Sequence, residues 1–76
     1  MLLSQCNEGD EVVVRKVAIP RLLVMGVVPG KVLNIVKYAP FKDPIEVAIS
    51  HNRLALRVSE AKLIEVELVA KDLKDE

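Results

Sequence analysis

Hydrophobic and polar residues alternate most plainly in the second half of the chain, in residues 45–50 and again in residues 53–58. A period of two is typical of strands with one buried face. The pattern therefore predicts two adjacent strands, with His51 and Asn52 as a two-residue turn between them. The side chains expected to face inward are Ile45, Val47, Ile49, Leu54, Leu56 and Val58.

Three further runs are interpreted as strands. Residues 11–18 follow a turn at Gly9 and are too rich in valine to alternate, so this strand is either buried on both faces or paired at a barrel seam. Residues 31–38 form another strand, ended by a loop with two prolines that cannot join the ladder. After a capped helical turn at residues 59–62, the last strand places Ile64, Val66 and Leu68 inward.

One short helix is predicted between the first two strands. Pro20 suits the first helical position and Gly26 the residue just past the end, while Pro29 and Gly30 suit the centre of a type II turn. Leu22 and Met25 lie on one side of this helix and are expected to cap the core. Either an exposed apolar patch forms from the remaining residues, or loops cover them; these residues are Leu23, Val24, Val27 and Val28.

These elements predict a mainly β protein: a small, partly open SH3-like β-barrel of about five strands with one short helix. A five-stranded OB-fold is the nearest alternative. The 76 residues allow one domain over residues 1–70, followed by a charged tail, 71–76, that we expect to fray. The only aromatic residues are Tyr38 and Phe41, so branched aliphatic side chains fill the expected core.

Charge and composition limit the classes of partner and the cellular compartment that we expect. The net charge is zero, although residues 12–57 hold eight Lys or Arg against two acids, and we interpret this basic region mainly as solvated surface. The zero net charge and scarce aromatics argue against nucleic acid as a partner. The lone Cys6, the lack of a signal peptide and the lack of a long apolar run favour a cytosolic protein without membrane insertion.

Few residues offer chemistry, and we expect neither an enzyme nor a cofactor. Cys6 and His51 are the weak candidates for a transition-metal site, but a small buried thiol and a turn histidine are the favoured interpretation. Arg21 and Arg57 are candidate polar anchors for a partner. The alternative is that they pair with surface carboxylates such as Glu60 or Asp43.

The order of motifs resembles the FeoA family, which accompanies the ferrous-iron transporter FeoB. The resemblance covers residues 3–68 and rests on four stretches: Leu3-Ser4 with Glu8-Gly9-Asp10, the run RLLVMGVVPG from Arg21 to Gly30, Ala39-Pro40 with Asp43-Pro44-Ile45, and LALRVSEAKLIEV from Leu54 to Val66, which includes Leu56 and Ala61. It implies an SH3-like barrel that regulates or binds the cytoplasmic GTPase part of FeoB without catalysis of its own.

Three departures from the family pattern concern the loops. His51 stands in place of the usual glycine before the Leu-Arg strand, Lys42 in place of the loop glycine, and the connection leading to Arg21 is short. Two other functions stay open at this point: an RNA- or ribosome-associated barrel, and a weak metal-binding or metal-bridged oligomer. Self-association is also expected to be possible, because an open barrel has free edge strands.

Overall fold

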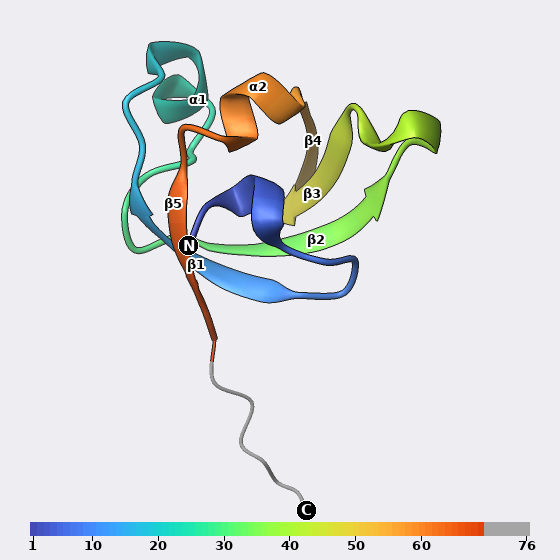
Figure 1. Cartoon of the computed structure of the whole chain (residues 1–76). Coiled ribbons are helices and arrows are strands. Elements are labelled where there is room, and N and C mark those ends of the chain that lie inside the picture. Colours follow the sequence, from blue (N-terminus) through green and yellow to red (C-terminus); the bar gives the residue numbers. More distant parts are fainter. Residues whose placement is uncertain (70–76) are drawn as a thin grey trace, which may run out of the picture.

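The computed structural model describes residues 1–69, so the predicted tail lies outside the described residues (Figure 1). The elements follow the order η1 (Leu3–Gln5), β1 (Glu11–Lys16), α1 (Pro20–Val24), β2 (Val32–Tyr38), η2 (Pro40–Lys42), β3 (Ile45–Ile49), β4 (Asn52–Leu56), α2 (Val58–Ala61) and β5 (Glu65–Leu68), where η marks a short 3-10 helix. No helix within this part of the chain is long and apolar enough to cross a membrane.

The five strands form one antiparallel sheet in the order β4-β3-β2-β1-β5. Its register shifts twice, between Val14 and Lys16 on β1 and between Ile35 and Lys37 on β2. Such irregularities bend a strand and increase its twist. The sheet accordingly curls around η1, with α1 and α2 side by side over one end (Figure 1). Because β4 and β5 do not pair, the barrel is partly open, which confirms the predicted fold.

Among the described residues, the buried side chains of the core are aliphatic apart from one thiol. Alternation places Ile45, Val47 and Ile49 of β3 inside, as predicted. β1 also alternates, with Val12 and Val14 buried. It is not buried on both faces, and it lies inside the sheet between β2 and β5, whereas the open seam lies between β4 and β5. The buried set is Leu3, Cys6, Val12, Val14, Val17, Leu22, Val27, Leu33, Ile35, Ile45, Val47, Ile49, Leu56, Ala61, Ile64 and Val66.

The turn of the β3–β4 hairpin differs from the prediction. The ladder pairs Ile49 with Asn52, so the two turn residues are Ser50 and His51 rather than His51 and Asn52. Ser50 has φ 54°, a positive value at the first central position that fits a type II′ turn. His51 therefore does lie in the turn, but the positive φ belongs to its neighbour.

One strand prediction extends too far, and another misplaces the side chain of its last residue. β4 ends at Leu56, because Arg57 and Val58 begin α2 instead of continuing the strand, and Val58 is half-buried. Leu68 was expected to face inward, yet it is 55% exposed at the end of β5. The Val58 error comes from carrying a period-two pattern past Leu56, the last paired residue of β4. Leu68 does pair, with Val12, but as the last residue of β5 its side chain is left exposed.

The N-terminal segment covers the outer edge of β5. Met1 and Val66 exchange hydrogen bonds, with 2.8 Å from Val66 N–H to the Met1 oxygen and 3.1 Å from the terminal amine to the Val66 oxygen. Leu3 N–H donates to the Ile64 oxygen at 2.9 Å, and its side chain is fully buried. The strand that ends the sheet on this side is therefore paired on both edges.

Candidate functional site: the α1 surface

Local sequence defines both ends of α1. Pro20 occupies the first turn, where its missing N–H has no intrahelical partner to lose. At the other end Gly26 has φ 96°. Its N–H bonds the Leu23 oxygen at 3.1 Å while Val27 N–H bonds the Leu22 oxygen at 2.9 Å. These two bonds form a Schellman motif, and the accompanying apolar contact is supplied by Leu22 and Val27, which are both fully buried.

The turn after α1 is tied to the sheet. Lys31 N–H donates to the Val28 oxygen at 3.0 Å around Pro29 and Gly30, and Gly30 has φ 92°, as the predicted type II turn requires. Gly30 N–H then donates to the Val14 oxygen at 2.8 Å, and Val14 N–H to the Lys31 oxygen at 2.8 Å. The turn therefore pairs with β1 through main-chain hydrogen bonds to Val14, and this pairing holds the end of α1 in place.

Apolar side chains on α1 and its turn point outward. Val24 is 87% exposed, and Leu23, Met25 and Val28 are each between 36% and 42% exposed. We call these four residues the α1 surface. It confirms the exposed patch that the sequence suggested as one of two outcomes, and corrects it in two places. Val27 is buried because it closes the Schellman motif, and Met25 is on the surface because it is the C-cap of α1 and does not cap the core.

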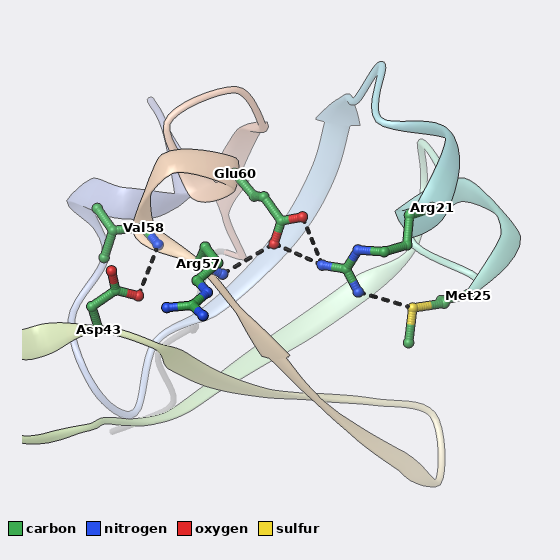
Figure 2. A network of polar contacts seen from close by, with 6 residues as sticks. All are labelled: Arg21, Met25, Asp43, Arg57, Val58 and Glu60. Carbon is green, nitrogen blue, oxygen red and sulfur yellow. Dashed lines mark hydrogen bonds and ion pairs between the residues drawn. The ribbon is translucent and has the colours of Figure 1, made fainter.

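An ionic contact joins α1 to α2 beside this surface. Arg21 Nη2 lies 2.7 Å and 2.6 Å from the two carboxylate oxygens of Glu60, and Arg21 Nη1 contacts the Met25 sulfur at 3.5 Å (Figure 2). Glu60 also accepts the Arg57 N–H at 3.0 Å, half of a capping box. The expected pairing of Arg21 with Glu60 is therefore found, and the same carboxylate caps α2.

The charge of Glu60 is favoured by these partners. The hydrogen bond from Arg21, followed by the one from the Arg57 N–H, lowers the pKa of the Glu60 carboxyl below its ordinary value. The ionised form therefore carries the link between the two helices at neutral pH. The Arg21 side chain remains half-exposed, so its guanidinium can also meet an acidic group of a partner.

Arg57 lies in a different structural element from the one predicted. It was expected on the outward face of a strand, but it is the residue that begins α2, with extended φ −71° and ψ 147°. Asp43 supplies the neighbouring cap, because its Oδ1 accepts the Val58 N–H at 3.2 Å (Figure 2). Within residues 1–69, the exposed Arg57 side chain forms none of the ion pairs, which involve Arg15, Arg21 and Arg53.

The remaining motif residues lie in the scaffold. Gly9 has φ 89° and donates its N–H to the Ile35 oxygen at 2.7 Å, which fixes the turn before β1. Pro44 precedes β3, and both Leu56 at the end of β4 and Ala61 at the end of α2 are fully buried.

The two weak metal candidates do not form a cluster. Cys6 is buried, its Sγ contacts the Leu2 oxygen at 3.7 Å, and burial, then the charge of Asp10, raises the pKa of its thiol. His51 is exposed in the β3–β4 turn. In the part of the chain that the structure describes, no three His, Cys, Asp or Glu side chains are grouped so that they could hold a metal ion.

A pocket next to Cys6, lined mainly by polar residues, was not foreseen. Its walls come from η1, the turn before β1, and the ends of β2 and η2, and the Tyr38 hydroxyl donates to the Cys6 oxygen at its edge. Burial raises the pKa of Tyr38.

Two exposed apolar residues were also not foreseen. Phe41, in the loop before β3, is fully exposed, and Leu63, after α2, is 66% exposed. Alternation could not have marked these two, because both lie in turns outside any period.

The fold and the surface together define a small SH3-like barrel that presents an ordered apolar helix. The sequence model of the FeoA domain matches residues 1–68, and the chain belongs to the FeoA family. Among solved structures, FeoA from Chlorobium tepidum is 37% identical, with a TM-score of 0.88 over 97% of this chain and 75% of that one.

Two further relatives add context. FeoA from Stenotrophomonas maltophilia, complexed with zinc and described as a prokaryotic SH3 domain protein, is 32% identical, with a TM-score of 0.78 over 88% of this chain and 89% of that one. A fusion of Fe(2+) transport protein A with the Fe(2+) transporter FeoB from Porphyromonas gingivalis is 39% identical over 75 residues, which is 92% of this chain. The chain spans only 9% of the length of that fusion protein. The family is thereby linked to ferrous-iron transport.

Proposed function

We propose that this chain is a non-enzymatic accessory protein of ferrous-iron transport that binds the cytoplasmic GTPase part of a FeoB-type transporter through the α1 surface. The observation that carries the proposal is Val24, an aliphatic side chain 87% exposed on a helix whose two ends are both fixed. An isolated exposed valine needs no explanation, but here it is the centre of four neighbouring apolar residues in sequence.

The α1 surface is ordered before any partner arrives. Its backbone is held by the Schellman motif and by the bonds from Gly30 and Lys31 to β1 and the turn. A partner that docks there does not have to order a loop, so less of the contact energy is offset by lost conformational entropy. Arg21, held by Glu60, adds a polar anchor at the border of the apolar residues.

Binding of this kind would regulate the transporter by population shift. A GTPase domain changes conformation with its nucleotide, and a protein that binds one conformation more tightly shifts the equilibrium toward it. The P. gingivalis relative supports the pairing of the two partners, because a single chain that contains both keeps them at a high effective concentration.

The test is a titration of this protein against the GTPase domain of a FeoB from the same organism, with a GTP analogue, with GDP and without nucleotide. We expect binding in at least one state, and a different affinity in another. Val24→Asp should weaken binding about tenfold or more, because it places a charge in an apolar contact. Its matched control is Leu63→Asp, which introduces the same charge at a residue 66% exposed elsewhere.

The outcomes separate the alternatives. Equal loss in both variants would mean that added negative charge, and not the α1 surface, decides binding. Unchanged binding in Val24→Asp would show that the partner contacts another face. Absence of binding in every nucleotide state would exclude the GTPase domain and direct the search to the membrane part of the transporter.

A further inference from the structure

The second exposed feature of the fold is the outer edge of β4. Within residues 1–69, β4 pairs only with β3, and it stands at the end of the sheet order. The loop between the two strands has two residues, so the closing pair of Ile49 and Asn52 exchanges both main-chain bonds. Since bonded pairs alternate along an antiparallel ladder, Leu54 also bonds β3, and the main-chain groups of Arg53 and Ala55 face away from it.

These outward groups have no partner inside the described chain. None of the main-chain hydrogen bonds beyond the regular ladders involves Arg53 or Ala55 within residues 1–69, and both residues are exposed. Two N–H and two C=O groups therefore form a template of the length that accepts one short added strand.

The side chains along this edge are cationic on the outer face. Arg53 and Ala55 point to that face, and the extended backbone of Arg57 carries its side chain to the same side. Arg53 pairs with Glu46 on β3 at 3.0 Å, whereas Arg57 forms no ion pair within residues 1–69. The edge thus has a small residue in the centre and an arginine two residues away on each side.

Charge argues against a second copy of the same edge. If two β4 strands paired through the outward groups of Arg53 and Ala55, the Leu54 residues would face each other. Arg53 would then lie opposite Ala55 of the other copy, diagonal to both of that copy's arginines, 53 and 57. Diagonal cross-strand positions are within reach of long side chains, so these arginines would repel one another. An added strand with acids at these positions would meet each arginine instead.

We propose that the free edge of β4 binds an extended acidic segment of a partner protein as an additional antiparallel strand. The expected pattern has two acids four residues apart, a small or β-branched residue between them on the same face, and apolar residues at the alternate positions toward Leu54 and Leu56. The inference is independent of the α1 surface, because it uses other residues and another kind of contact.

The probe is a capped peptide of sequence Glu-Val-Thr-Val-Glu, added to the full chain and followed by NMR. Binding should shift the signals of β4 and slow hydrogen exchange at the amides of Arg53 and Ala55. The matched peptide Lys-Val-Thr-Val-Lys should bind several-fold more weakly. Arg57→Gln should weaken binding of the acidic peptide about two- to fivefold, which is the range expected for one exposed ion pair. Lys37→Gln should leave this binding unchanged.

A backbone variant tests the edge itself. Ala55→Pro removes one outward N–H and leaves the bonds to β3 in place, so it should abolish peptide binding while the chain stays folded. Hydrogen exchange in the unaltered chain gives a second measurement if this variant fails to fold. The proposal is overturned if the acidic peptide shifts the NMR signals of another region or of none, or if both peptides bind equally. It is also overturned if the β4 signals shift with protein concentration alone, which would identify a second copy as the occupant.

Discussion

The two ends of the sheet are protected in different ways. On the β5 side, the N-terminal segment adds main-chain bonds from Met1 and Leu3 and buries the Leu3 side chain completely. On the β4 side, the outer main-chain groups meet no other segment of residues 1–69, and the strand is followed by Glu60, which accepts the Arg57 N–H and pairs with Arg21. One edge is closed by apolar burial, and the other is left short and cationic.

This difference bears on how an open barrel limits unwanted strand pairing. An exposed strand edge is a template for unwanted pairing, and charged residues with short length are common defences. β4 has five residues and carries Arg53 outward, so it repels its own copy while staying accessible to an oppositely charged strand. The closed edge contributes stability, and the open edge is available for recognition.

The strongest test of the closed edge removes its buried anchor. Leu3→Ala should lower the free energy of unfolding by about 2–4 kcal/mol, because it leaves a cavity under the segment that covers β5. Chemical denaturation measures the effect. Leu63→Ala, at a side chain 66% exposed, is the control and should change stability by less than about 0.5 kcal/mol. Equal effects would mean that the N-terminal segment does not hold the edge.

Hydrogen exchange compares the two edges directly. Val66 N–H donates to the Met1 oxygen, whereas the N–H groups of Arg53 and Ala55 face solvent. We expect Val66 to exchange on the order of a hundredfold more slowly than these two, since a bonded amide exchanges only when the structure opens. NMR of the free protein gives the rates. If Ala55 were as protected as Val66, the β4 edge would already be covered in solution.

Acid should loosen the β4 side selectively. Arg21 and the Arg57 N–H lower the pKa of Glu60 in the folded state, so the contribution of Glu60 to stability is complete above its unfolded pKa and disappears as the pH falls through the folded value. At pH 7, Glu60→Gln should cost about 1 kcal/mol, from one partly exposed ion pair and one cap. The difference from the unaltered chain should vanish at a pH below the folded pKa.

Arg15 offers the control for that experiment. Its pair with Glu67 spans 3.0 Å between side chains that are both more than half exposed, on the β1 and β5 strands. Glu67→Gln should therefore cost less than Glu60→Gln at pH 7, because it loses a solvated pair and no helix cap. An equal cost would show that capping and the link to α1 add nothing to the exposed ion pair.

The turns that contain a glycine were predicted correctly from the sequence, and the β3–β4 turn, which contains none, was not. Gly26 and Gly30 adopt positive φ where the pattern placed a helix end and a type II turn, and the elements around them are correct. Both glycines are required by their positive φ and not by crowding. A Cβ on Gly26 would meet only the Ile49 side chain, at 4.0 Å, and a Cβ on Gly30 would meet nothing within 4 Å. The β3–β4 turn lacks a glycine, and there the prediction was displaced by one residue, because Ser50 gives no comparable signal.

The candidate site was predictable to a similar extent. The helix ends were clear, but the burial of Val27 depends on the Schellman contact with Leu22, and no periodicity over five residues reveals it. The pairing of Arg21 with Glu60 joins residues 39 positions apart, so it was one of several options in sequence. The open edge of β4 follows from the strand order, which alternation along single strands does not determine.

The smallest effect is expected from relieving backbone strain on the β3–β4 side. The loop before β3 holds Phe41 at φ 68° and Lys42 at φ 67°, a region that favours glycine. Lys42→Gly should stabilise the chain by up to about 1 kcal/mol, the strain relieved less the added freedom of the unfolded chain. Thermal unfolding measures it. Lys37→Gly within β2 is the control and should destabilise. A loss of stability in both variants would show that the Lys42 side chain contributes more than its conformation costs.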